Sequence, residues 1–562
     1  MRPILSILLV GITAGLCLAQ STDQLAQHIQ DVTIKGNVYE QTLDKQTKNN
    51  CLISISVLDT KKGEETIFEL NAADLNEHAI SFDTRKSSVM VSAQVQGKRN
   101  LIRVYEDGEI DGYDDKMTLL AAGIEEAREL VDAFKQMVKE CNEKASATPE
   151  SVAGTSAQDW QAFLEKEINT VEINGEQFAQ AFSCKSAQPH LIQYEMTEPD
   201  KGELNTYEFN LTDLNESKVS FDTKGTAVWV SAQTRGERDL VKHTTNGEVK
   251  GYQDEIVLLA RDIEHARLIE QVWKKLISAT ESNNTGFLAG NQNPTIEQTL
   301  AFLTKQTGKV TINEEAYEQK ISYQKSPHSY GGYLMTYTVN DLSKAEESVF
   351  QWNILDVNPA SLVFDTKRSD VFVNLQTQTK DDLIAYHENG TLKAYTNGLS
   401  LRANSIEEAR ALSMALSHLA TKTKEMKPEP TLPDSYTATL SYVQQRVGDI
   451  NLADENYQQS LSAQESKECL LSYKLTDENE GDEYAYHWNL NDLSESSIAF
   501  QTKKDKVLVV LRTSGKKELI EVVENGEVDK YEDELSIMAE GIEEAREIVA
   551  GLKHLSTFCK TK

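Results

Sequence analysis

Five cysteines lie beyond the first 19 residues, and four of them occupy matching positions in an internal repeat. Cys51 and Cys469 each lie 23 residues before a repeated aspartate, and Cys141 and Cys559 each lie 67 residues after it. Two other copies of the repeat lack both members of the pair, as expected if the members are bonded. We therefore expect the disulfides Cys51–Cys141 and Cys469–Cys559, which are typical of exported proteins. Cys184 is left over as either a buried, inert thiol or one that pairs between molecules.

An acidic run is the best candidate for binding a metal. Residues 106–115 are dense in carboxylates and glycine, as oxygen-rich calcium loops are. The spacing does not match an EF-hand, and two copies of the repeat place Lys250 and Lys393 where this run has Asp111. We therefore favour an acidic hairpin turn, and we expect neither a metal site nor a cofactor.

The sequence contains no recognisable catalytic constellation. It has no Gly-x-Ser-x-Gly elbow, Walker loop, His-Glu-x-x-His or Cys-x-x-Cys motif. The ten histidines are scattered, and a lone histidine is more often structural than catalytic. We expect no catalytic residues, although a carboxylate pair for acid–base catalysis stays open among 89 acidic residues.

A fourfold repeat must position all of these residues. A 54-residue block recurs without insertion or deletion, and such repetition fixes the architecture. Structural roles are expected for its aspartates and tyrosines, which are Asp74, Asp213, Asp356, Asp492, Tyr113, Tyr252, Tyr395 and Tyr531. We expect the tyrosines to be core or cross-strand packing residues, with ligand stacking as the alternative.

Composition divides the chain into four domains. Small, polar or proline-containing stretches at 144–156, 278–294 and 424–433 are expected to be linkers. The resulting segments are a leader at 1–19, repeat 1 at 20–144, repeat 2 at 157–279, repeat 3 at 294–424 and repeat 4 at 434–562. A segment of this size can bury its own core, so we expect four independent domains rather than a stacked solenoid.

Each repeat is expected to begin with a short amphipathic helix and to continue as about seven strands. In repeat 4 the expected strands lie near residues 458–462, 470–475, 484–490, 497–502, 507–513, 518–524 and 531–538. Trp352 and Trp488 fall on the inward-facing row of the third strand and are expected in the core. Two-residue hairpin turns are predicted at Asp107-Gly108, Asn246-Gly247, Asn389-Gly390 and Asn525-Gly526.

A second, longer helix is expected to close each repeat. Its N-cap residues are Gly123, Asp262, Ser405 and Gly541, all types that favour this position. In repeat 4 an apolar stripe continues to Cys559, whose thiol should therefore face the body of the domain.

This order of strands and closing helix resembles the pleckstrin-homology-like barrel. The resemblance covers most of each copy and implies an α+β fold, in which each repeat is a mostly antiparallel, strongly bent sheet or small barrel capped by its last helix. Family members that bind phosphoinositides use basic residues between the first two strands. Residues 462–468 hold no basic cluster, so this lipid-binding activity is not expected.

The first 19 residues are typical of a secretory signal, with a charged start, an apolar run and a small final residue. We expect cleavage near Ala19 and Gln20, and a secreted or periplasmic location. A membrane anchor is disfavoured because the apolar run is shorter than about 18 residues. A lipoprotein modified at Cys17 is less favoured because Leu16 is bulkier than such cleavage sites usually tolerate.

A formal net charge of −32 is spread along the chain. Nucleic acid, phosphoinositides and anionic membrane surfaces would be repelled, so we do not expect them as partners. The repeats share apolar, turn and cap residues rather than polar clusters. We therefore expect an exported, non-enzymatic binding or scaffolding protein whose partner is another exported or envelope protein. The alternatives are a carrier of a small apolar or cationic ligand in the barrel mouths, or an enzyme with a site in a single copy. The oligomeric state is not predicted.

Overall fold

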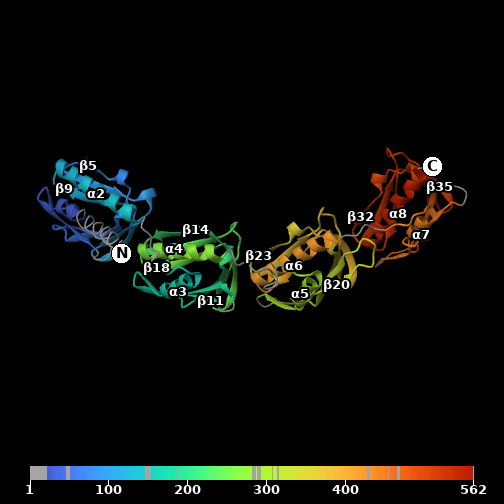
Figure 1. Ribbon diagram of the computed structural model, residues 1–562, viewed down its shortest axis with the longest axis horizontal. Helices are drawn as coiled ribbons and strands as arrows, with labels where there is room; N and C mark the ends of the chain where they lie inside the picture. Colours follow the sequence, from blue (N-terminus) through green and yellow to red (C-terminus); the bar gives the residue numbers. More distant parts are fainter. Residues whose placement is uncertain are drawn as a thin grey trace, which may run out of the picture. The chain divides into compact units, whose positions relative to one another are not determined.

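The computed structural model gives an α+β fold in which one grouping of sheets occurs four times (Figure 1). It describes residues 22–45, 51–145, 153–185, 188–280, 287, 293–306, 308–312, 315–426, 431–452, 455–464 and 469–560. The expected leader lies outside the described residues, as do parts of the three expected linkers. None of the helices in this described part is long and apolar enough to cross a bilayer.

The chain divides into two compact units, Met1–Asn284 (unit 1) and Thr285–Lys562 (unit 2). Unit 1 contains repeats 1 and 2, and unit 2 contains repeats 3 and 4. The boundary between the units falls in the expected linker at 278–294.

Each repeat contains nine strands among its described residues. In repeat 1 they are β1 (Val32–Ile34), β2 (Asn37–Lys45), β3 (Leu52–Asp59), β4 (Glu64–Asn71), β5 (Ser81–Arg85), β6 (Ser88–Gln94), β7 (Ile102–Glu106), β8 (Glu109–Asp114) and β9 (Lys116–Ala121). In repeat 2 they are β10 (Val171–Ile173), β11 (Glu176–Lys185), β12 (Gln188–Thr197), β13 (Leu204–Asn210), β14 (Leu214–Lys224), β15 (Ala227–Thr234), β16 (Val241–Thr245), β17 (Glu248–Gln253) and β18 (Glu255–Ala260).

The same order recurs in unit 2. In repeat 3 the strands are β19 (Lys309–Ile312), β20 (Glu315–Lys325), β21 (Tyr333–Asp341), β22 (Glu346–Asn353), β23 (Val363–Lys367), β24 (Asp370–Gln376), β25 (Ile384–Glu388), β26 (Thr391–Thr396) and β27 (Gly398–Ala403). In repeat 4 they are β28 (Ile450–Asn451), β29 (Asn456–Ala463), β30 (Leu470–Asp477), β31 (Glu483–Asn489), β32 (Ala499–Lys503), β33 (Lys506–Arg512), β34 (Ile520–Glu524), β35 (Glu527–Glu532) and β36 (Glu534–Ala539).

Two open antiparallel sheets make up each repeat. In repeat 1 a six-stranded sheet has the order β1-β2-β3-β4-β7-β8 and a three-stranded sheet has the order β5-β6-β9, and the other repeats follow the same order. The expectation of about seven strands in one bent sheet or small barrel is therefore wrong in count and in closure. The antiparallel α+β part of that expectation is confirmed.

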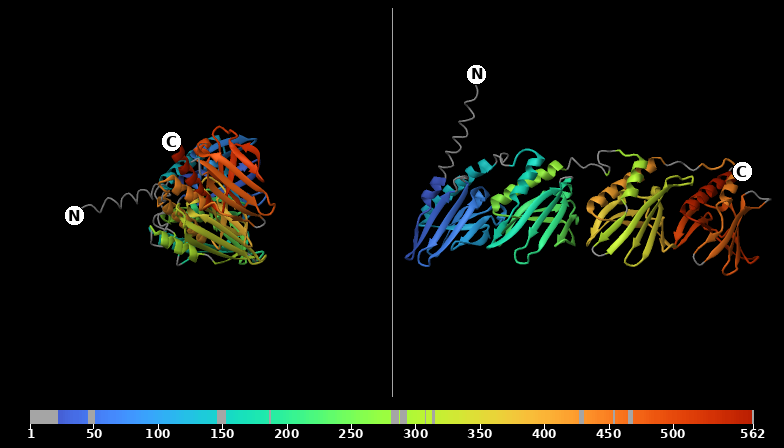
Figure 2. Two further views of the ribbon diagram at one scale, coloured as in Figure 1. Left: turned by 90° about the vertical axis from the view of Figure 1, so that its right-hand side faces the viewer. Right: turned by 90° about the horizontal axis from the view of Figure 1, so that it is seen from below.

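Helices cover one face of each repeat (Figure 2). Opening helices are α3 (Ala157–Glu167), α5 (Ile296–Lys305) and α7 (Tyr436–Gln444), and residues 22–28 are helical in repeat 1. Closing helices are α2 (Ile124–Ala145), α4 (Ile263–Thr280), α6 (Ile406–Glu425) and α8 (Ile542–Lys560). Each closing helix begins one residue after its predicted N-cap, so these four boundaries are confirmed.

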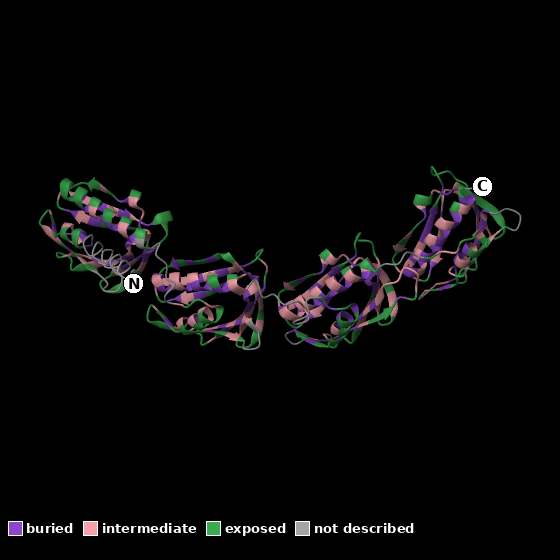
Figure 3. Ribbon diagram, viewed as in Figure 1, coloured by how far each residue is buried: buried purple, intermediate pink, exposed green. Residues whose placement is uncertain are grey.

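Local sequence explains the hairpins and the helix faces. At all four predicted turns both residues have positive φ, for example 52° at Asn246 and 85° at Gly247, so the two-residue turns are confirmed. The closing helices bury one stripe and expose the other, as the alternating colours of Figure 3 show. In α8 the buried stripe includes Leu552, Leu555 and Cys559. Trp352 and Trp488 are buried as expected.

Both predicted disulfides are present. Cys51, just before β3, is bonded to Cys141 in α2, and Cys469, just before β30, is bonded to Cys559 in α8. Each bond attaches the closing helix of its repeat to the six-stranded sheet. Cys184 is a half-buried free thiol, and burial together with the neighbouring Glu165 raises its pKa to about 12. The thiolate is therefore a minor species at neutral pH.

The repeats of unit 1 are not independent domains. A single cluster of buried apolar side chains runs through both repeats, from Leu25 to Ile277. Each of the closing helices α4 and α8 packs on its own repeat, but its first turn also contacts the preceding repeat. The chain therefore forms two compact units, each of which contains two repeats.

Candidate functional site at the repeat junctions

The repeated aspartate lies at the junction between the two repeats of a unit. In unit 1, Asp74 ends a short 3-10 helix, and Arg267 in the first turns of α4 donates to both of its carboxylate oxygens at 2.8 Å. Beside this pair, the Asn71 Nδ2 donates to the Glu264 carboxylate at 3.0 Å. Burial raises the pKa of Asp74, and the charge of Arg267 opposes that effect. Both bonds come from the Nη2 atom of Arg267, and such charge-assisted hydrogen bonds to a half-buried carboxylate are stronger than bonds between neutral groups.

Unit 2 repeats this arrangement residue for residue. The Arg546 Nη2 donates to Asp356 at 2.5 Å, and the Asn353 Nδ2 donates to Glu543 at 3.1 Å. A further bond joins Arg546 to Glu543 within the first turn of α8, at 2.7 Å. Because the same contacts recur in both units, they form a repeated interface rather than a chance contact.

A second set of contacts lies beside the charged pair. In unit 1, the Thr223 hydroxyl donates to the Asn100 carbonyl at 2.7 Å, and Arg99 donates to the Phe221 carbonyl while lying 4.3 Å from its ring centre. In unit 2, the Thr502 hydroxyl donates to the Asp382 carbonyl at 3.0 Å. The repeated phenylalanine therefore packs at the junction. It belongs to the same repeat as the arginine that binds the repeated aspartate.

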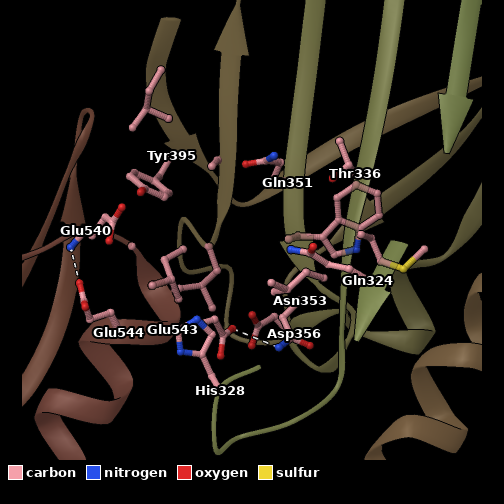
Figure 4. A pocket seen from close by; sticks show the side chains of 18 of the residues that line it. Gln324, His328, Thr336, Gln351, Asn353, Asp356, Tyr395, Glu540, Glu543 and Glu544 are labelled. Carbon is pink, nitrogen blue, oxygen red and sulfur yellow. Dashed lines mark hydrogen bonds between the residues drawn. The ribbon is translucent and has the colours of Figure 1, made fainter. Parts of the chain in front are cut away.

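A cavity of about 440 Å³ opens at the junction of repeats 3 and 4. Strands of repeat 3 supply Gln351 and Trp352 (Figure 4). Glu540, which follows β36, and Glu543 and Glu544 in the first turn of α8 lie opposite. The side chains that line it are a mixture of polar and apolar types. The Glu543 Oε2 and the Trp352 indole N–H are buried and have no hydrogen-bond partner among the described residues.

The corresponding space in unit 1 is smaller, about 230 Å³. Arg103 and Glu69 stand there where unit 2 has Ala385 and Gln351, and the two form an ion pair at 3.6 Å. The Arg103 side chain occupies volume that the Ala385 methyl leaves open.

The repeated tyrosines do not share one environment. Tyr113 is buried in the core of unit 1, and Tyr395 packs against the apolar cluster of repeat 4. Tyr252 is half-buried, whereas Tyr531 is exposed and donates to Glu521 at 3.2 Å. Tyr113 is thus a core residue, whereas Tyr531 lies at the surface and contacts its cross-strand neighbour Glu521.

The other candidates for chemistry stay apart. The acidic run at 106–115 forms the end of β7, the hairpin turn and β8. Within the described residues, no three His, Cys, Asp or Glu side chains are grouped so that they could hold a metal ion. Asp213 is buried and Asp492 is half-buried. Each ends a 3-10 helix that corresponds to the one ending at Asp74.

Sequence reasoning missed the arginines and glutamates that bind the repeated Asn and Asp. The signal was available, since the closing helix carries Glu-x-x-Arg in every copy, at Glu125–Arg128, Glu264–Arg267, Glu407–Arg410 and Glu543–Arg546. The matching Asn-x-x-Asp also recurs, at Asn71–Asp74, Asn210–Asp213, Asn353–Asp356 and Asn489–Asp492. Comparisons of the chain with protein-family models, with curated proteins and with solved structures give no match, so the junction geometry is the basis for the functional argument.

Proposed function

We propose that the chain is an exported, non-enzymatic scaffolding protein that acts through contacts of its four repeats. The observation that carries this proposal is the use made of the shared polar residues. Asn71, Asp74, Glu264 and Arg267 join one repeat to the next, and their counterparts in unit 2 do the same. This use of shared polar side chains for contacts between repeats supports a role in protein contacts rather than in catalysis.

Export agrees with the cysteine chemistry. Two disulfides in one chain are typical of an oxidising compartment and unusual in a reducing one. The formal net charge of −32 favours a partner with a basic surface and disfavours nucleic acid and anionic lipid. An exported or envelope protein with basic patches is therefore the partner class that fits best.

Capture experiments test this function. The bait is the full chain, compared with unit 1 and unit 2 expressed separately and immobilised at equal molar density. If a partner offers several sites, linked repeats gain avidity, and the full chain should retain it at least tenfold longer than either unit. Capture of the same partner with the same lifetime by one unit alone would contradict the multivalent part of the proposal.

A second candidate function is the carriage of a small cationic ligand in unit 2. Its specific support is the 440 Å³ cavity with Trp352 at its wall and the carboxylates Glu540, Glu543 and Glu544 at its edge. Carboxylates and an aromatic face favour an organic cation. Calorimetric titration with tetraalkylammonium ions and their neutral analogues tests this idea.

The chain supplies its own blocking variant for that titration. Arg103 is the residue of unit 1 that corresponds to Ala385. The substitution Ala385→Arg should therefore fill the cavity without disturbing the fold. Cation binding that is lost in this variant supports a carrier. Cation binding that persists unchanged would show that the cavity is not the site.

A further inference from the structure

Repeats 1 and 4 each carry one half of the junction that joins repeats inside each unit. The half contributed by a closing helix, here called the donor surface, consists of the isoleucine, glutamate and arginine of its first turns. The half contributed by the preceding repeat, the acceptor surface, consists of the Asn-x-x-Asp turn and the neighbouring strands of the six-stranded sheet. Repeat 1 has a donor surface and repeat 4 has an acceptor surface, and neither is used within its own unit.

The donor surface of repeat 1 is formed but uncovered. Arg128 and Glu125 form an ion pair at 2.5 Å at the start of α2. Arg546 and Glu543 form the corresponding pair in α8. The Arg128 side chain is 57% exposed, whereas that of Arg546 is 14% exposed. Phe82 and Thr84 stand in repeat 1 where Phe221 and Thr223 contact the preceding repeat in unit 1.

The acceptor surface of repeat 4 is equally formed. The Asn489 Oδ1 accepts a hydrogen bond from the Asn491 N–H at 2.9 Å, as the Asn353 Oδ1 does from the Leu355 N–H at 3.1 Å. The Asn489 Nδ2 and the Asp492 carboxylate have no hydrogen-bond or ion-pair partner within the part of the chain that the structure describes.

Apolar side chains at the unused surfaces of repeats 1 and 4 are more exposed than their counterparts at the junction of unit 1. Ile124 is 46% exposed, and its counterpart Ile263 is 9% exposed. Tyr531 is 52% exposed, and its counterpart Tyr113 is 8% exposed. At the same end Leu519 and Val528 are also exposed. Large exposed apolar groups that gather at a polar recognition site mark a protein interaction surface.

We infer that copies of this chain associate end to end, with the donor surface of repeat 1 on one copy binding the acceptor surface of repeat 4 on the next. Charge complementarity is the same as inside each unit, where Arg pairs with Asp and Glu pairs with Asn. The contact joins two unlike surfaces, so it is heterologous and propagates into chains of molecules unless a ring closes. The assembly does not depend on which external partner the repeats bind.

Association is expected to be weak and dependent on concentration. Inside a unit, a short linker holds neighbouring repeats at an effective concentration on the order of millimolar, so a junction of modest affinity suffices there. The same surfaces on separate molecules meet only at their bulk concentration. Sedimentation velocity on the purified chain from about 10 μM to about 1 mM should therefore show a weight-average mass that rises beyond that of a dimer.

Charge reversal at either end tests the assignment of the two surfaces. Arg128→Glu removes the donor surface and Asp492→Arg removes the acceptor surface, so each variant alone should remain monomeric over the same range. A mixture of the two variants retains one intact pair of surfaces and should regain association. The double variant Arg128→Glu/Asp492→Arg restores the pair with its charges exchanged and should also associate.

Matched controls separate this effect from a general change of charge. Lys139→Glu changes an exposed residue further along helix α2. Glu480→Arg changes the hairpin before β31, at the opposite end of that strand from Asn489. Both variants should associate like the parent chain. Thermal unfolding checks that each variant is folded. A parent chain that stays monomeric at 1 mM, or single reversals that associate as well as the controls, would overturn the inference.

Discussion

Glu547 is a buried carboxylate that joins the two repeats of unit 2. It accepts hydrogen bonds from the Ser329 N–H and hydroxyl, both at 2.9 Å, and from the Arg446 Nε at 2.6 Å. Burial disfavours its charged form, but these hydrogen bonds outweigh burial and lower the pKa of Glu547 to about 2. Ionised Glu547 therefore stabilises the folded state, since a lowered pKa favours folding whenever the group is charged.

Replacing Glu547 should make the stability of unit 2 less sensitive to acid. The stabilisation is present above the ordinary glutamate pKa of 4.5 and is lost as the pH falls toward 2. Glu547→Gln should lower the free energy of unfolding at pH 7 by at most about 3 kcal/mol, and the difference from the parent chain should vanish near pH 2. Denaturant titrations at pH 7, 4 and 3 measure this difference.

Unit 1 is the internal reference for that experiment. It has Leu268 at the position of Glu547, so its unfolding transition should be unaffected by the substitution at every pH. A stability difference in unit 2 that is the same at pH 7 and pH 3 would contradict an ionic role for Glu547.

Single residues were predictable where the repeats differ from one another, and not where all four agree. The cysteine pairs could be predicted because they are present together in repeats 1 and 4 and absent together elsewhere. Asp74 and Arg267 recur in every copy, and a residue common to all copies can face either its own core or the next repeat. Sequence alone does not distinguish these two cases, which is why the junction was missed.

A buried glutamine links the two sheets of every repeat. The four side chains belong to the second strand of the six-stranded sheet. The Nε2 atom of each glutamine donates to a backbone carbonyl in the last strand of the three-stranded sheet. The bonds are Gln41–Leu120 at 2.9 Å, Gln180–Leu259 at 3.2 Å, Gln319–Arg402 at 2.8 Å and Gln459–Met538 at 2.9 Å. This contact holds the sheets together where the strands themselves do not pair.

Removing this link should destabilise the element pair that it joins. In repeat 4, Gln459 also donates to the Gly448 carbonyl at 2.7 Å and accepts from the Tyr473 hydroxyl at 2.6 Å. Gln459→Leu leaves these buried groups without partners, and we expect a loss on the order of 3 kcal/mol in the free energy of unfolding.

Gln458 provides the matched control on the same strand. Its side chain is exposed on the other face of β29, so Gln458→Leu should change the stability by less than about 0.5 kcal/mol. Urea titrations of the two variants measure both changes. Equal effects of the two substitutions would show that the glutamine link contributes nothing.

At the scale of elements, helix boundaries and hairpin turns were predictable, and sheet membership was not. The closing helices carry caps and apolar stripes, and the turn dipeptides specify positive φ, so local chemistry determines both. In repeat 4, however, β35 and β36 are separated only by Asp533, and they belong to different sheets. A period-two pattern continues through such a switch, so the sequence predicts one strand at 531–538. The two-residue strand β28 is too short to give any pattern.

At the scale of the whole molecule, each unit has one repeat with a disulfide and one without. In unit 2, helix α8 is held at both ends, because Arg546 near its start binds Asp356 of repeat 3 and Cys559 near its end is bonded to Cys469. The disulfide closes a loop of 90 residues, for which the chain-entropy model gives up to about 4–5 kcal/mol. Helix α8 thus couples the stability of repeat 4 to the junction with repeat 3.

Loss of this disulfide should therefore reduce the protection of backbone amides on both sides of the junction. In the Cys469→Ser/Cys559→Ser variant we expect faster amide hydrogen exchange in α8, and also at Ile354–Asp356 of repeat 3, where α8 docks. In unit 1, helix α4 makes the same contact with Asp74 but has Thr280 at the place of Cys559, so its exchange should not change. Cys184→Ser, which removes a free thiol, is the control for the substitution chemistry. Faster exchange confined to repeat 4, with the Asp356 turn as protected as in the parent chain, would show that the two repeats of a unit are joined without being energetically coupled.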